Sequence, residues 1–237
     1  MVNKQVINEL PNCVQNWLIN SGVLQKEMIR TVSLRQELQL KLKPGQKEWY
    51  HAEANQIFTI EPPAFKWTLK LRMNSFISLV GRDIFENGKG AMSIKLFHII
   101  PLVNVKDNSK INQATLQRYL GEIVWFPSAA LSPFINWEQI DNTTAKATMS
   151  YEGTTGSGTF YFKNNGDFEK FEAIRYKETA ENSKPILWTV TAIETEERNG
   201  IRIPTRLKAD WKLEGGNWTW LNVKIKSIKY NVKNTDH

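Results

Sequence analysis

Charged side chains stand at several positions where the surrounding pattern is apolar. Burying a charge costs free energy unless a partner neutralises it, so such positions mark either a binding site or an internal ion pair. A guanidinium group can form two parallel hydrogen bonds to a carboxylate or a phosphate. The residues concerned, which we take as candidate ligand-binding residues, are Arg82, Asp83, Arg118, Glu122 and Arg175, with Trp125 on the same helical face as Arg118 and Glu122.

Two interpretations of these residues stay open at the level of the sequence. In the first, Arg82, Arg118 and Arg175 hold the anionic group of a ligand, and Asp83 and Glu122 orient the arginines. In the second, the same charges form structural salt bridges between a helix and a sheet, or are exposed to solvent. Arg118 and Glu122 lie four positions apart, so one helical turn would let them pair with each other.

Known catalytic motifs are absent from the sequence. It contains no nucleophile elbow, no phosphate-binding loop and no paired-histidine metal motif. The glycine-rich segment 153–158 has no helix after it, and we interpret it as a flexible turn. His98, in an apolar stretch, is expected to be packed rather than catalytic. With one cysteine and three scattered histidines, we expect no disulfide framework, no metal site and no cofactor, and we assign no catalytic residue.

The elements that must position the charged residues are mainly strands. From Met28 to Leu42 most even positions are apolar and most odd positions are polar, and the segments 65–73 and 201–213 show the same alternation. Alternation predicts one buried and one solvated face, whereas parallel strands are usually buried on both faces. We therefore expect an antiparallel sheet, with the segment 81–83 interrupting one of its strands.

Turn signals agree with an antiparallel sheet. Asn87-Gly88, Asn165-Gly166 and Asn199-Gly200 each separate two strand-like segments, and Asn-Gly favours a tight hairpin turn. The apolar phase slips near Ser227, which predicts a β-bulge there. Pro204 has no backbone N–H to donate, so its strand is expected to be bulged or to lie at an edge.

Two segments have helical spacing instead. The first runs from Pro11 to Asn20, and the second runs from about Asn112, a plausible N-cap, to Phe126, where Pro127 stops it. These two short helices are few beside ten or more expected strands. The prediction is a mainly β (α+β) protein with residues 1–237 in a single domain.

A wide antiparallel sheet with one apolar face is expected to curve, because strand twist accumulates across it. We predict a large, strongly curved sheet or half-barrel, with the two helices and a loop at 96–105 covering its concave face. Space that they leave unfilled would form an apolar pocket. Trp218 and Trp220, beside a Gly-Gly turn, would either line its rim or pack across strands. The alternatives are two layers packed on each other and an interior filled by side chains.

The charge and the hydropathy of the chain limit the kinds of partner that we expect. The formal net charge is +7, but the basic residues are dispersed at alternate strand positions, which is typical of the solvated face of a sheet, and no nucleic-acid partner is predicted. The chain has no apolar stretch of the roughly 20 residues needed to span a membrane. We expect a soluble protein and favour the cytoplasm, unless an N-terminal signal or anchor has been removed.

Several motifs together resemble a bacterial family of unknown function. The most specific runs from Arg118 to Pro127 (Arg-Tyr-Leu-Gly-Glu-Ile-Val-Trp-Phe-Pro) and continues through Ser-Ala-Ala-Leu. Weaker matches are Leu10-Pro11, Trp17-Leu18, Ser21-Gly22, 30–32, 81–83, 87–90, 171–176 and Ile203-Pro204. The resemblance spans nearly the whole chain and implies a bacterial origin and a fold similar to the half-barrels of lipoprotein carriers. It implies no activity, cofactor or catalytic residue.

These observations favour a binding or carrier protein for a lipid or another hydrophobic ligand. The alternative is a hydrolase-like enzyme in which Glu122 or Asp83 acts as acid or base beside an arginine-held anionic substrate. A third hypothesis is an interaction module in peripheral contact with a membrane surface.

Overall fold

The computed structural model describes residues 1–73, 76–97 and 99–232; His98 lies outside these residues. Its helices are α1 (Lys4–Ile7), α2 (Asn12–Asn20) and α3 (Ser109–Glu122), followed by the 3-10 helices η1 (Ile123–Trp125) and η2 (Pro127–Leu131). Its strands are β1 (Thr31–Leu40), β2 (Tyr50–Thr59), β3 (Ala64–Arg72), β4 (Ser78–Glu86), β5 (Lys89–Leu96), β6 (Ile100–Val105), β7 (Ile135–Gln139), β8 (Thr144–Tyr151), β9 (Thr154–Phe162), β10 (Phe168–Arg175), β11 (Ile186–Arg198), β12 (Ile201–Leu213) and β13 (Gly216–Tyr230).

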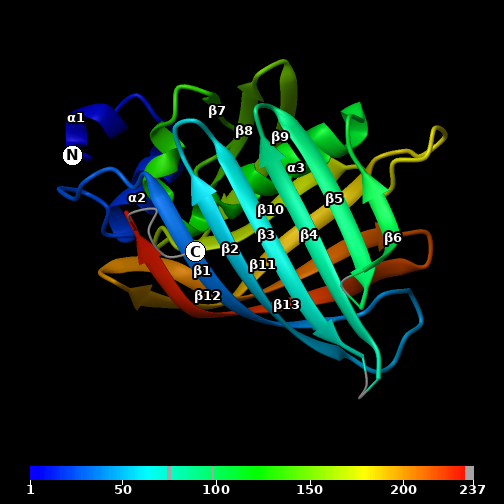
Figure 1. Ribbon diagram of the computed structural model, residues 1–237. Helices are drawn as coiled ribbons and strands as arrows, with labels where there is room; N and C mark the ends of the chain where they lie inside the picture. The colour runs from blue at the N-terminus through cyan, green and yellow to red at the C-terminus, as the bar shows by residue number, and fades with distance from the viewer. Residues whose placement is uncertain (74–75, 98, 233–237) are drawn as a thin grey trace.

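All thirteen strands belong to one antiparallel sheet. Their order is β6-β5-β4-β3-β2-β1-β13-β12-β11-β10-β9-β8-β7, so two meanders are joined where β1 pairs with β13. The sheet curls into a half-barrel, with β1–β6 on one side and β8–β11 on the other (Figure 1). The predicted fold class is confirmed, and the alternative of two packed layers is wrong, because a single ladder runs through every strand.

The strand alternation places one face of the sheet in the interior. In β1 the even residues from Val32 to Leu40 are buried, as the sequence predicts. Arg35 pairs with Ser227 and Gln36 with Ile225, so the predicted bulge is confirmed. The ladder also shifts beside Pro204, which confirms a bulge there. The edge alternative for Pro204 is wrong, since β12 lies between β11 and β13.

The predicted tight hairpin turn is present at two of the three Asn-Gly pairs. Asn87-Gly88 and Asn199-Gly200 both have positive φ at each residue, whereas in Asn165-Gly166 only the glycine does. Segment 153–158 is not a flexible turn: only Gly153 belongs to a turn, and the following residues form β9. Position 158 has no room for a side chain, because a Cβ there would lie 2.1 Å from Cζ of Phe171.

Both predicted helices cover the concave face. In α2, the Trp17 ring stacks on Phe162 with centroids 5.5 Å apart. The longer α3 lies inside the curve of the sheet (Figure 1) and is capped by Asn108 rather than Asn112, because the Asn108 side chain accepts a hydrogen bond from the N–H of Lys110. Regular α-helix ends at Glu122 instead of Phe126, and the chain continues through η1.

Two further predictions are corrected. Segment 81–83 does not interrupt a strand: its backbone continues through β4 and pairs with β3 and β5 on either side. Segment 96–105 is not a loop over the concave face, because Ile100–Val105 forms the edge strand β6 and pairs with β5.

Candidate functional site

The charged residues of β4 and α3 form an ion-pair cluster that we call the charged triad: Asp83, Arg118 and Glu122. Nη1 of Arg118 lies 2.6 Å from Oδ2 of Asp83, and its Nε lies 2.9 Å from Oε1 of Glu122. The Arg118 guanidinium also lies over the Trp67 ring, 4.8 Å from its centroid. All three charged side chains are at most 15% exposed. The predicted pairing of helix to sheet is therefore present.

Burial governs the electrostatics of the triad. It raises the pKa of Glu122 above its ordinary range, although hydrogen bonds from Arg118 and Gln56 oppose the rise. Burial alone would lower the pKa of Arg118, but Glu122 and Asp83 together raise it. Oδ1 of Asp83 is sealed from solvent and has no hydrogen-bond partner among the described residues.

Two buried glutamines extend the triad into the sheet. The side-chain amide of Gln56 donates to Oε2 of Glu122 at 2.7 Å, and that of Gln36 donates to Oε1 of Gln56 at 3.1 Å. Nε1 of Trp67 donates to Gln36 at 3.0 Å. Sequence reasoning missed both glutamines. A polar residue in the apolar phase of a strand, as at Gln36, was the available signal.

Arg175 lies at the end of β10, on the concave face. Its Nε donates to the backbone oxygen of Ala114 on α3 at 2.9 Å. Its Cζ lies 4.6 Å from the ring centroid of Trp188 and 5.6 Å from that of Trp211. Arg175 forms no ion pair with the triad, but the charges of the triad act on it at longer range. Burial lowers the pKa of Arg175 to about 10.

The other two candidate residues lie elsewhere. Arg82 is exposed, because it follows the opposite phase of β4 from Asp83 and points away from α3. Trp125 is buried in the core, where its Nε1 donates to the backbone oxygen of Pro204 at 3.1 Å and its ring contacts Phe58. Arg82 therefore does not join the other arginines, and Trp125 does not share a surface with Glu122.

Part of the concave face carries apolar side chains that the helices cover only in part. We call this set the concave apolar wall. Register places its members on the same face as Asp83 and Trp188, and each is half-buried. They are Leu69, Leu79, Met92, Ile94 and Val103 on one side, and Val190, Trp218, Trp220 and Val223 on the other.

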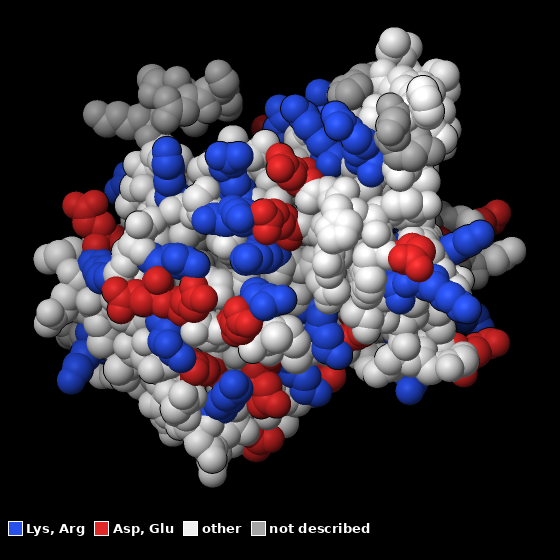
Figure 2. Space-filling view, turned by 90° about the horizontal axis from the view of Figure 1, so that it is seen from below, with Lys and Arg blue, Asp and Glu red and all other residues white. Residues whose placement is uncertain are grey.

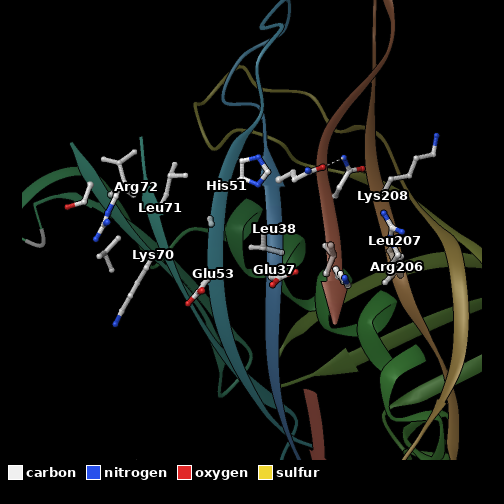
Figure 3. A pocket seen from close by; sticks show the side chains of 18 of the residues that line it. Glu37, Leu38, His51, Glu53, Lys70, Leu71, Arg72, Arg206, Leu207 and Lys208 are labelled. Atoms are coloured by element: carbon white, nitrogen blue, oxygen red, sulfur yellow. Dashed lines mark hydrogen bonds between the residues drawn. The ribbon is translucent and has the colours of Figure 1, made fainter. Parts of the chain in front are cut away.

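A hollow of about 1160 Å³ is lined by residues of β1–β4 and β11–β13 that belong to both faces of the sheet. Figure 3 shows Lys70 and Arg72 on one side of it, Arg206 and Lys208 on the other, and acidic residues of β1 and β2 between them. These side chains occupy the solvated phase of their strands. The lining also includes Leu38, Leu71 and Leu207, and Leu79 and Val223 of the concave apolar wall. Because charged and apolar groups share it, this hollow is not the mostly apolar pocket that the sequence predicts.

Two neighbouring hairpin ends expose large apolar side chains. Phe76 in the β3–β4 connection is 85% exposed, and Ile99 in the β5–β6 connection is 78% exposed. The N–H of Phe97 donates to the oxygen of Ser78 at 2.9 Å, which holds the two ends side by side. Ile100 and Leu102 on β6, which begins beside Ile99, are also exposed. Figure 2 shows an uncharged lobe with Lys and Arg side chains beside it.

The part of the chain that the structure describes holds no group of three His, Cys, Asp or Glu side chains placed to bind a metal ion. Within residues 1–73, 76–97 and 99–232, no helix combines the length and apolar character needed to cross a membrane.

Two solved structures are similar to this chain. A DUF1329 family protein from Desulfovibrio piger matches with a TM-score of 0.50 and 7% identity over 94% of each chain. A LolA superfamily protein from Nitrosomonas europaea matches with a TM-score of 0.46 and 11% identity, over 93% of this chain and 94% of the other. At 7% identity, the first likeness shows the fold alone. No curated protein matches the sequence.

The family resemblance is confirmed. Residues 8–230 match the model of a family of unknown function, DUF6920, and the chain belongs to that family.

Proposed function

We propose that this DUF6920 protein is a binding or carrier protein for a lipid or another hydrophobic ligand, held on the concave face of the half-barrel. The observation that supports this most is the concave apolar wall, whose side chains remain half-buried although they face the interior. Covering them with a ligand chain removes apolar surface from water. A 14-carbon chain would contribute on the order of 10 kcal/mol before the costs of ordering and association.

The charged triad supports binding over the hydrolase-like alternative. Oε1 of Glu122 accepts from Arg118 and Oε2 accepts from Gln56, so both carboxylate oxygens are engaged in structural hydrogen bonds. A general acid or base needs hydrogen-bond reach to a substrate proton. In this arrangement Glu122 stabilises the packing of α3 against the sheet.

Native mass spectrometry of the purified protein tests for a co-purified lipid. Titration with the neutral fluorescent probe N-phenyl-1-naphthylamine gives a second measurement that is independent of ligand charge. Ile94→Arg places a charge on the concave apolar wall and should weaken probe binding at least tenfold. Ser93→Arg, on the outer face of the same strand, is the matched control and should bind as the wild type does. Absence of both lipid and probe binding would refute the proposed function.

A lipid carrier has to meet a bilayer, and the hairpin ends suit that contact. Exposed apolar patches of this kind are typical of interaction surfaces. Lys70, Arg72 and Lys95 lie on the strands that lead to them and would attract anionic headgroups. The protein should therefore sediment with phosphatidylglycerol-containing vesicles more than with phosphatidylcholine vesicles. Phe76→Ser combined with Ile99→Ser should abolish the difference, whereas Ile174→Ser, at a 58% exposed position on β10, should not.

A further inference from the structure

The arginine of β10 differs from that of the charged triad in having no acidic partner. Arg118 contacts two carboxylates, whereas no carboxylate lies within ion-pair distance of Arg175 among the described residues. Asp83 and Glu122, whose charges act on Arg175 at longer range, are already engaged by Arg118. Arg175 keeps its positive charge at neutral pH, since its pKa stays near 10. A largely buried guanidinium without a counter-ion is costly, and such groups are usually paired.

The contacts of Arg175 hold its guanidinium in place and leave its two terminal nitrogens without a hydrogen-bond partner among the described residues. One hydrogen bond, from Nε to the backbone of Ala114, anchors the side chain to α3. The guanidinium lies over the neighbouring rings of Trp188 and Trp211, which stabilise its charge through their faces. Its two terminal nitrogens have no hydrogen-bond partner among the described residues and are not among the polar atoms sealed from solvent. Two parallel donors in a fixed plane match a carboxylate or a phosphate.

The neighbouring strands supply more donors without acceptors. The indole nitrogens of Trp188, Trp218 and Trp220 have no hydrogen-bond partner among the described residues, and Trp188 is only 5% exposed. Trp188 pairs with Trp211, and Trp211 with Trp218, across β11, β12 and β13. An indole N–H can donate but not accept. These three N–H groups are sealed from solvent and do not contact a ligand directly. They add positive polarity on the strands beside Arg175, which favours an anionic ligand group over a neutral one.

We propose that Arg175 binds the anionic headgroup, a carboxylate or a phosphate, of an amphiphile whose chain lies along the concave apolar wall. The proposal rests on the proposed function, and it adds the class of ligand and the residue that selects it. Trp218 belongs to that wall and pairs with Trp211, over which Arg175 lies, so the headgroup site adjoins the chain site. The competing explanation is that Arg175 only balances the two carboxylates of the triad at a distance.

Ligands of equal chain length separate these explanations. Dodecanoic acid, dodecyl phosphate and dodecan-1-ol would each displace N-phenyl-1-naphthylamine from the wild-type protein. The two anions should bind at least tenfold more tightly than the alcohol, and the better of the two identifies the headgroup. Arg175→Gln should remove that preference and leave the affinity for the alcohol within about twofold. Arg82→Gln, on the opposite face of the sheet, is the matched control and should keep the full preference.

Each outcome is decisive for one of the two proposals. Equal affinity for acid and alcohol in the wild type, or an undiminished preference in Arg175→Gln, would overturn the headgroup site and leave the carrier function standing. Binding of none of the three ligands would overturn the carrier function itself. If Arg175→Gln does not fold, Arg175→Lys and Trp188→Phe carry the test. Both should lower the affinity for the anions severalfold and leave the alcohol unaffected.

Discussion

Arg118 and Asp83 are 35 residues apart in the sequence, and an ion pair of 2.6 Å joins their side chains across the interior of the half-barrel. The same guanidinium holds Glu122 one helical turn further along α3. Through these contacts α3 is attached to β4 by charge as well as by apolar packing.

Removing the cation of the triad should destabilise the protein strongly. Arg118→Met leaves Asp83 and Glu122 facing each other without a counter-charge, and breaking a buried pair in this way typically costs about 3–5 kcal/mol. Urea unfolding followed by tryptophan fluorescence measures the loss. Arg82→Met changes an exposed arginine next to Asp83 on β4 and should alter the free energy of unfolding by less than about 0.5 kcal/mol. Equal stability of the two variants would contradict the structural role of the triad.

Acid stability should depend on Asp167. Nε and Nη2 of Arg202 donate to its two oxygens at 2.7 and 2.8 Å, and Asn20 of α2 donates at 2.7 Å. These partners lower the pKa of Asp167 to about 2. Because the folded pKa lies below the unfolded one, the stabilisation is present above about pH 4 and is lost as the pH falls toward 2.

Asp167→Asn tests this dependence. It should lower the free energy of unfolding at pH 7 by roughly 1–2 kcal/mol, a figure reduced for the partial exposure of Arg202, and should flatten the loss of stability between pH 4 and pH 2. Thermal unfolding across that range provides the measurement. An unchanged pH profile in the variant would show that another carboxylate dominates acid unfolding.

Close packing of β9 on β10 should make Gly158 intolerant of a side chain. A Cβ there would lie 2.1 Å from Cζ of Phe171, and Phe171 is fully buried, so Gly158→Ala should cost about 1–3 kcal/mol. Gly215→Ala is the control, because nothing lies within 4 Å of its Cβ position. Adding Phe171→Leu to Gly158→Ala should recover part of the loss, and failure of both effects would argue against this packing.

Trp125 should prove structural rather than ligand-binding. Trp125→Phe removes the donor to the backbone oxygen of Pro204 and leaves that oxygen unpaired, at a cost of about 1–3 kcal/mol. Affinity for N-phenyl-1-naphthylamine should stay unchanged, since the ring lies in the core. Trp49→Phe, a half-buried position where Lys41 lies over the ring, should affect neither property. A loss of probe affinity in Trp125→Phe would return Trp125 to the ligand site.

Local patterns in the sequence determined the class of fold. Alternation such as that of β1, the Asn-Gly turns and the phase slip near Ser227 depend on neighbours within a few residues, and each specifies strand, turn or bulge directly. The width of the sheet followed from the number of strands, and its curvature from accumulated twist. The two covering helices were also readable, although their ends shifted by a few residues because capping and packing decide termini.

The tertiary structure decided which charges meet. Adjacent strand residues face opposite sides, so Asp83 points to α3 and Arg82 to solvent, a distinction that depends on the phase of β4 relative to the core. Gln36 and Gln56 became partners only because β1 pairs with β2 in one register. Arg175 lies over the rings of Trp188 and Trp211, which β11 and β12 bring together, for the same reason. Composition and periodicity therefore determined that the sheet of this chain curves around its apolar face. Strand register and the position of α3 on the sheet decided which polar groups there have no partner.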